Sequence, residues 1–233
     1  MITVLGASGF IGSSIVNALK NNKVDFYAPM RIDNLLNKDM GHILYCIGLT
    51  ADFRTRPFET VTSHVCKLNE ILEKCTFSSL TYLSSTRVYI NAISKIVSET
   101  DKLIVDPLND DDLYTLSKLT GECLCISSRK NIKIVRLSNV IGATDSSINF
   151  LSQIINDIKT KGTLHLKQSL LSAKDYIFID DVANMLIKIA VEGKEKIYNL
   201  ASGINTTNES IIAELQKYFT FSYTIDENAK KIV

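Results

Sequence analysis

The sequence predicts an α/β fold in which a doubly wound parallel sheet is covered by helices on both faces. Two observations predict it. Short apolar runs alternate with stretches of helical spacing through most of the 233 residues, which is the pattern of repeated strand and helix units. The chain also opens on an apolar run, residues 1–5, that passes through a glycine-rich turn into a helical stretch. A strand that enters a helix through glycines is typical of doubly wound sheets.

The individual elements follow from the spacing of the apolar residues. Strands are expected at residues 1–5, 24–28, 42–48, 80–85, 132–137, near Leu164, and at 176–179 and 197–200. Helices are expected after the glycine turn and at residues 58–74, 112–127, 150–161, 180–191 and 207–219. Only about ten residues separate Arg31 from the strand at residue 42, so a loop or a single turn is expected between them.

The length suits one Rossmann-type domain with a substantial core. We expect residues 1–233 to form this domain, with a small C-terminal substrate lobe whose segments lie mainly within 142–175 and 201–233. The sequence contains only three prolines and no Pro/Gly-rich linker.

The composition excludes several classes of function. A net charge of +1, with 45% hydrophobic and 22% charged residues, argues against nucleic acid or a membrane surface as the main partner. The five cysteines contain no CxxC pair, which predicts reduced thiols in a cytoplasmic protein. The three histidines lack the spacing of metal ligands, so no metal is expected. Affinity for an anion must therefore come from a local site.

The glycine turn is such a site. Glycines let the backbone approach a pyrophosphate, and the N–H groups and dipole of the following helix start bind the anion. The alternative is an ordinary tight turn between a strand and a helix. The residues expected to bind the dinucleotide here are Gly6, Ser8, Gly9, Phe10, Ile11 and Gly12.

The end of the second strand decides between NAD and NADP. An acidic residue there would bond the ribose hydroxyls, whereas an arginine would accommodate the extra phosphate. Arg31 stands in or just beyond that position, so NADP is favoured, and Asp33 is close enough to keep NAD open.

A tyrosine and a lysine, Tyr114 and Lys118, are four residues apart on an expected helix and therefore share one of its faces. The alternative is an amphipathic helix with a structural tyrosine. A cation near Tyr114 would favour its phenolate and so help it to exchange a proton. An expected strand before this helix ends in Ser84, Ser85 and Thr86, which could hold a substrate oxygen.

These motifs together resemble the extended short-chain dehydrogenase/reductases, the NAD-dependent epimerase/dehydratase family that modifies nucleotide-linked sugars. The resemblance covers most of the chain. It rests on the glycine turn, residues 84–89 (SSTRVY), 114–122 (YTLSKLTGE), 136–142 (RLSNVIG), 174–183 (KDYIFIDDVA) and 198–203 (YNLASG).

The resemblance implies roles for particular residues. Ser85 would hold the substrate oxygen, Tyr114 would pass the proton, and Lys118 would also hydrogen-bond the cofactor ribose. Substrate contacts are expected from Ser85, Thr86, Asn139 and Lys174. Asn139 could instead pin a loop, and Lys174, where many relatives carry arginine, could be a solvated lysine.

The function expected from the resemblance is reduction of a keto group on a nucleotide-linked sugar. The alternatives are an epimerase, a non-catalytic dinucleotide-sensing regulator and a reductase of a small carbonyl compound. Dehydratases of the family carry an Asp-Glu pair where this chain has Thr86 and Arg87, which argues against water elimination. His64 replaces a familiar asparagine, and a homodimer is usual for the family.

Overall fold

The computed structural model of the chain describes residues 1–30, 38–50, 52–94, 96–142 and 150–231. The chain forms two compact units, which are described separately below. The first consists of Met1–Ser138 and Ile179–Leu200, and the second of Asn139–Phe178 and Ala201–Val233.

A six-stranded parallel sheet forms the centre of the first unit, in the order β2–β1–β3–β4–β5–β9. Its strands are β1 (Ile2–Leu5), β2 (Phe26–Tyr27), β3 (His42–Tyr45), β4 (Ser79–Ser85), β5 (Ile132–Leu137) and β9 (Ile197–Leu200). The apolar residues of the inner strands are buried because helices cover both faces of the sheet, and this is why these strands read as unbroken apolar runs. The predicted α/β class is confirmed.

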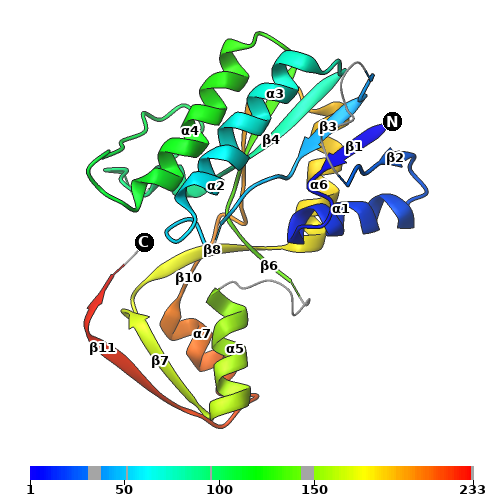
Figure 1. Cartoon of the computed structure of the whole chain (residues 1–233). Coiled ribbons are helices and arrows are strands. Elements are labelled where there is room, and N and C mark those ends of the chain that lie inside the picture. The colour runs from blue at the N-terminus through cyan, green and yellow to red at the C-terminus, as the bar shows by residue number, and fades with distance from the viewer. Residues whose placement is uncertain (31–37, 51, 95, 143–149, 232–233) are drawn as a thin grey trace. The chain divides into compact units, whose positions relative to one another are not determined.

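Helices lie on both faces of this sheet (Figure 1). One face carries α1 (Phe10–Asn21) and α6 (Ile179–Glu192), which pack against each other. The other carries α2 (Pro57–Val61), α3 (Lys67–Lys74) and α4 (Asp112–Ser127), and α4 packs on β4 and β5. Since all strands run in the same direction, the segments that follow them meet at one edge of the sheet, where doubly wound folds bind their ligands.

The helix predicted over residues 58–74 is present but is not a uniform α-helix. Between α2 and α3 the backbone forms a π-helical turn at Thr62–Cys66. This wider turn buries Ser63 and His64. Apolar spacing does not predict this π turn, because the residues that it turns inward, Ser63 and His64, are polar. Such turns are frequent at functional sites.

Among its described residues, the second unit has two small sheets and two helices. One sheet has the order β10–β8–β6 and the other pairs β11 with β7. The elements are β6 (Asn139–Ile141), α5 (Phe150–Lys161), β7 (Thr163–Gln168), β8 (Ala173–Phe178), β10 (Asn205–Thr207), α7 (Asn208–Leu215) and β11 (Ser222–Lys230). Its core is formed by Ile154, Ile158, Leu164, Leu166 and Ile212.

Three strands of the second unit, β6, β10 and β11, were not predicted. The first two have three residues each, too few to show alternation. The third is mostly exposed and carries mainly polar residues, so it has no apolar pattern, and its pairing with β7 is what makes it a strand.

Candidate active site

The glycine turn joins β1 to α1, and the fold itself requires two of its three glycines. Gly6 has a φ of +85°, and a Cβ there would lie 2.8 Å from the carbonyl carbon of Cys46. A Cβ on Gly12 would lie 2.2 Å from the carbonyl oxygen of Gly6. At Gly9, in contrast, a Cβ would meet no atom closer than 3.4 Å. The fold does not need glycine at residue 9, so the missing side chain leaves space for a ligand.

The start of α1 offers backbone N–H groups to such a ligand. Gly9 is the N-cap and supplies no side-chain hydrogen bond to the first turn. Ser8 and Gly9 are exposed, and Phe10 and Ile11 begin the helix. Uncapped N–H groups at a helix start favour an anion. The turn therefore fits the pyrophosphate of a dinucleotide. Arg31 and Asp33, on which the choice between NADP and NAD depended, lie outside the described residues.

Tyr114 lies in the first half of α4 and is almost completely buried. Its hydroxyl is hydrogen-bonded to the side chains of Ser85, at the end of β4, and Thr50, in the segment after β3. Burial raises the pKa of the phenol, whereas the bond to Ser85, the charge of Arg87 and the bond to Thr50 lower it. The structure therefore brings Ser85 to Tyr114 and adds two neighbours that the sequence did not predict.

Lys118 lies one turn further along α4, with its Nζ 5.9 Å from the centre of the Tyr114 ring. Nζ donates a 2.9 Å hydrogen bond to the carbonyl oxygen of Leu83 in β4. Burial lowers the pKa of Lys118 to about 7, against the charges of Glu122 and Cys46, which raise it. The sequence predicted Lys118 as the cation that favours the phenolate. In the structure Nζ donates a hydrogen bond to a backbone carbonyl, and the cation whose charge lowers the pKa of Tyr114 is Arg87.

His64, in the π turn, is fully buried beside Tyr114. The centres of the two rings are 5.3 Å apart and the ring planes meet at 86°, an edge-to-face contact. His64 Nε2 accepts a 3.2 Å hydrogen bond from the N–H of Leu49, and Nδ1 lies 2.8 Å from the Ser117 hydroxyl. That hydroxyl donates its proton to the Tyr114 carbonyl, so Nδ1 must be the protonated nitrogen.

This arrangement keeps His64 neutral. Burial, followed by the charge of Lys118, lowers its pKa to about 3. The ring links the first half of α4 to the segment after β3, which carries Thr50. The sequence marked His64 only as a replacement for asparagine and did not predict this link.

A signal for Thr50 was present in the sequence. Thr50 follows the apolar run at residues 42–48, much as Ser85 ends the apolar run at 80–85. Because β3 and β4 are parallel neighbours, polar side chains that follow them meet at the same edge of the sheet. The contact with Arg87 had no such signal, because it depends on how α4 packs.

The remaining predicted substrate residues use their polar groups within their own units. In the first unit, Thr86 donates a 3.2 Å hydrogen bond to the carbonyl oxygen of Leu137. In the second unit, Asn139 Nδ2 donates a 2.9 Å bond to the carbonyl oxygen of Asp175. Lys174 Nζ lies 4.6 Å from the centre of the Phe150 ring. The amide of Asn139 is thus bonded to β8, and its contact with a substrate stays a prediction.

A buried ion pair supports the strand that ends in Ser85. Arg136 in β5 and Glu122 in α4 are each about 4% exposed, and Arg136 Nη2 lies 2.7 Å from Glu122 Oε2. Glu122 also accepts a 2.5 Å bond from Ser84, the neighbour of Ser85. Arg136 Nη1 donates a 2.6 Å bond to the hydroxyl of Tyr89. The pair therefore ties α4 to β4 and β5 beside the site.

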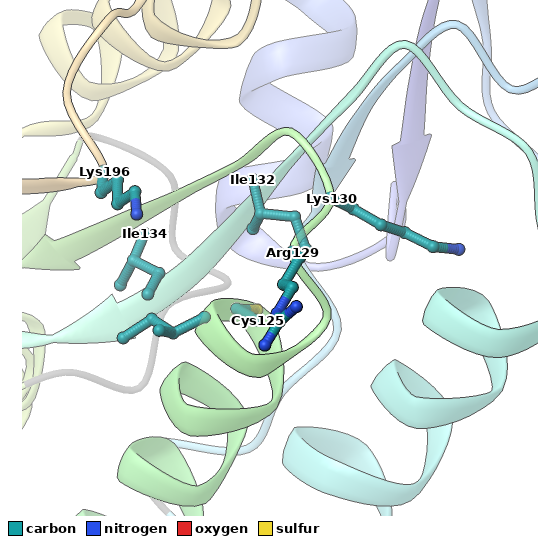
Figure 2. A pocket seen from close by; sticks show the side chains of 7 residues that line it. Cys125, Arg129, Lys130, Ile132, Ile134 and Lys196 are labelled. Carbon is teal, nitrogen blue, oxygen red and sulfur yellow. The ribbon is translucent and has the colours of Figure 1, made fainter.

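A separate hollow of about 230 Å³ lies at the other end of α4 (Figure 2). It is lined by Cys125, Ile126, Arg129, Lys130, Ile132, Ile134 and Lys196. These residues come from the end of α4 and the starts of β5 and β9, whereas Tyr114 and Ser85 lie toward the opposite ends of their elements. The hollow is therefore distinct from the candidate site.

Over the residues that the structure describes, no group of histidine, cysteine and carboxylate side chains could hold a metal ion. In the same part of the chain, no helix combines the length and apolarity that a membrane crossing requires. The five cysteines, all of which are described, form no disulfide bond.

The doubly wound parallel sheet, the glycine turn at the first strand and the edge where Ser85 meets Tyr114 define a Rossmann-like nucleotide-binding protein. The chain belongs to the NAD dependent epimerase/dehydratase family, whose model matches residues 32–201. The resemblance inferred from the motifs is confirmed, and with it the class of NAD(P)-dependent enzymes. The match begins after the glycine turn, so the turn is additional evidence.

Solved structures share this fold. TunA, an NAD-dependent NDP-hexosamine 5,6-dehydratase involved in tunicamycin biosynthesis, has a TM-score of 0.79 at 18% identity, over 99% of this chain and 84% of its own. RMD from Pseudomonas aeruginosa, solved with NADPH, has a TM-score of 0.77 at 20% identity, over 99% and 88%.

A UDP-glucuronic acid 4-epimerase from Bacillus cereus, solved with UDP-glucuronic acid and NAD, has a TM-score of 0.77 at 20% identity, over 99% of this chain and 86% of its own. At these identities the likeness shows the fold alone. No curated protein sequence matches the chain.

Proposed function

We propose that the protein is an NAD(P)-dependent oxidoreductase that reduces a keto group on a nucleotide-linked sugar. The observation that carries this proposal is the buried hydroxyl of Tyr114, hydrogen-bonded to Ser85 and one helical turn from Lys118. The family and the solved neighbours support the substrate class, since several neighbours were solved with nucleotide sugars or a dinucleotide.

Tyr114 is the proposed proton donor. A carbonyl oxygen at the Tyr114 hydroxyl would accept the phenolic proton while the Ser85 hydroxyl holds the same oxygen in place. The bound nicotinamide supplies the hydride that reduces the carbonyl carbon. Thr50, which also bonds the phenol, and Arg87, whose charge lowers its pKa, would stabilise the phenolate left after transfer.

Lys118 is proposed to bind the cofactor and, through it, to orient the reacting groups. Its Nζ donates one bond to the carbonyl oxygen of Leu83 and has further protons for ribose hydroxyls. With a pKa of about 7, Lys118 exchanges a proton readily in the neutral range. The turn from Gly6 to Gly12 would bind the pyrophosphate. The choice between NADP and NAD stays open, with NADP favoured by Arg31.

Lys174, Asn139 and Thr86 are proposed substrate contacts. A lysine binds phosphate as a point charge, which suits Lys174 to the nucleotide diphosphate. Water elimination is disfavoured, because Thr86 and Arg87 supply no carboxylate directly after Ser85. A cytoplasmic location and a homodimer complete the proposal. The absence of disulfide bonds agrees with a reducing compartment.

The test is a Tyr114→Phe variant, which removes only the phenolic oxygen. It should bind NADPH or NADH as the wild type does and lose turnover of 4-keto nucleotide sugars by about 10²–10⁴-fold. Tyr218→Phe is the matched control, because Tyr218 is 73% exposed and should not affect turnover. Full turnover by Tyr114→Phe would refute the mechanism.

The same assay separates reductase from epimerase. Oxidation of one reduced dinucleotide for each sugar converted identifies a reductase. Interconversion of two sugars without net oxidation identifies the alternative, an epimerase that returns the hydride to the other face. Dinucleotide binding without turnover of any sugar would favour the regulator.

A further inference from the structure

The proposed function uses the charge of Arg87 to stabilise the Tyr114 phenolate but gives the Arg87 guanidinium no ligand. Arg87 lies in the short helix Thr86–Tyr89, two residues after Ser85. Its guanidinium lies 5.4 Å from the centre of the Phe53 ring, and that ring lies 5.3 Å from the ring of Tyr114. Lys118 follows Tyr114 on α4, whereas Asp111, next to Arg87, precedes it. Arg87 is therefore on the side of Tyr114 away from the lysine proposed to hold the cofactor.

The charge of Arg87 is only partly neutralised. Its Nη2 lies 4.0 Å from Asp111 Oδ2, beyond hydrogen-bond distance. The other oxygen of Asp111 accepts a 2.5 Å bond from Arg54 Nε. The single negative charge of Asp111 thus lies beside two positively charged guanidinium groups. Asp112 accepts bonds from neutral donors, including Asn91, and acts on Arg87 only at longer range.

The Arg87 guanidinium is also poorly hydrogen-bonded. Its buried Nε has no hydrogen-bond partner among the described residues. Burial, followed by the charge of Arg54, lowers the pKa of Arg87, and the nearby carboxylates oppose this without reversing it. Since a desolvated cation without full hydrogen bonding is costly, an anion at this position would be favourable. The side chain is 28% exposed, so a ligand can reach it.

We propose that Arg87, supported by Arg54, binds a carboxylate carried by the sugar that reacts at Tyr114. The substrate would then be a nucleotide-linked acidic sugar, such as a uronic acid. A guanidinium matches a carboxylate with two parallel hydrogen bonds, which gives orientation as well as charge. This inference rests on the proposed function and adds the substituent that the site selects.

A structural role for the same residues makes different predictions. Arg54 and Arg87 both lie near the Phe53 ring, with the nearer guanidinium, that of Arg54, 4.4 Å from its centre. If these two arginines only hold the Phe53 segment onto α4, Arg87→Gln would lower the stability of the protein and would weaken the binding of all ligands equally. If Arg87 binds a carboxylate, the variant would lose selectivity between ligands that differ in that group alone.

UDP-glucuronic acid and UDP-glucose are such a pair, and UDP is the reference for contacts with the diphosphate. Calorimetric titration of the full-length protein should give about tenfold or tighter binding of UDP-glucuronic acid than of UDP-glucose. Arg87→Gln should abolish this preference and leave UDP affinity unchanged, and Arg87→Lys should retain a part of it. Arg56→Gln is the control, because Glu59 pairs with Arg56 on the surface.

Three results would overturn the inference. These are equal affinity of the wild type for both sugars, an undiminished preference in Arg87→Gln, and an equal loss for all three ligands including UDP. An equal loss for all three ligands would mean that Arg87 binds the diphosphate or only stabilises the fold. Binding without preference refutes the acidic substrate and leaves the proposed function intact. If neither UDP-sugar binds, the proposed function is refuted for sugars linked to uridine nucleotides.

In that case sodium glucuronate and glucose are compared directly by NMR. The Nε–H signal of Arg87, assigned by its absence in Arg87→Lys, should shift with glucuronate and stay unchanged with glucose. A shift with neither compound, or the same shift with both, would overturn the inference.

Discussion

Burial of His64 as a neutral ring predicts that the protein loses stability as the pH falls below 7. In the folded chain the pKa of His64 is about 3, against an ordinary value of 6.5 when the chain is unfolded. Between these values the unfolded chain binds a proton at His64 and the folded chain does not. Stability that is present above pH 6.5 is therefore lost progressively as the pH falls toward 3.

The size of this loss follows from the same pKa values. Each pH unit below 6.5 costs about 1.36 kcal/mol until the folded ring also takes up a proton. At pH 5 the titration of His64 has therefore lowered the free energy of unfolding by about 2 kcal/mol, which is a large fraction of the stability of an ordinary domain. Replacing His64 by asparagine removes the titrating group, so the variant should lose about 2 kcal/mol less than the wild type between pH 7 and pH 5.

The assay is urea unfolding at pH 7, 6 and 5, with circular dichroism as the signal for the folded chain. Comparing the wild type with His64→Asn cancels the titration of every group that the two proteins share. His165→Asn is the matched control, because the His165 side chain is exposed and should leave the pH dependence of the wild type unchanged. His64→Gln provides a second variant if the asparagine does not fold. Equal losses in the wild type and the His64 variants would refute a buried, neutral histidine.

Two further predictions concern the glycine turn and the buried ion pair. Gly9→Ala should keep the free energy of unfolding within about 1 kcal/mol of the wild type and weaken dinucleotide binding, whereas Gly12→Ala should cost at least about 2 kcal/mol because its Cβ meets the carbonyl oxygen of Gly6. Urea unfolding and dinucleotide titration check both variants. Equal effects of the two substitutions on stability and on dinucleotide binding would contradict the different roles assigned to Gly9 and Gly12. Glu122→Gln should cost about 3–5 kcal/mol because it leaves the buried charge of Arg136 unpaired. Unfolding at pH 7 checks this, and a loss below about 1 kcal/mol would show that the pair does not stabilise the fold.

The main unit was largely predictable from the sequence because its pattern is local. Apolar runs predicted every strand of its sheet, although the second is shorter, at Phe26–Tyr27, than the 24–28 expected. The helix at residues 112–127, which carries Tyr114 and Lys118, has the bounds that its periodicity indicated. The small strands of the second unit could not be predicted, because pairing with distant segments makes them strands.

The candidate site was predictable only in part. The spacing of Tyr114 and Lys118 on one helix face is a property of the sequence, and so is the serine at the end of a strand. The residues that surround Tyr114 come from segments far apart along the chain, such as Thr50 and Arg87. The hydrogen bond of Thr50 to the phenol and the effect of the Arg87 charge on it are decided by how β3, β4 and α4 pack.

The sequence by itself determined the fold class, the glycine turn after the first strand and the position of Tyr114 and Lys118 on one helix face, because each is written in short, local patterns of spacing. The tertiary structure alone decided the environment of these residues. It placed Arg87 beside Tyr114, buried Lys118 and kept His64 neutral. Burial, the distance between charges and the hydrogen bonds between side chains depend on the packing of remote segments, and together they shift the pKa values of Tyr114, Lys118 and His64.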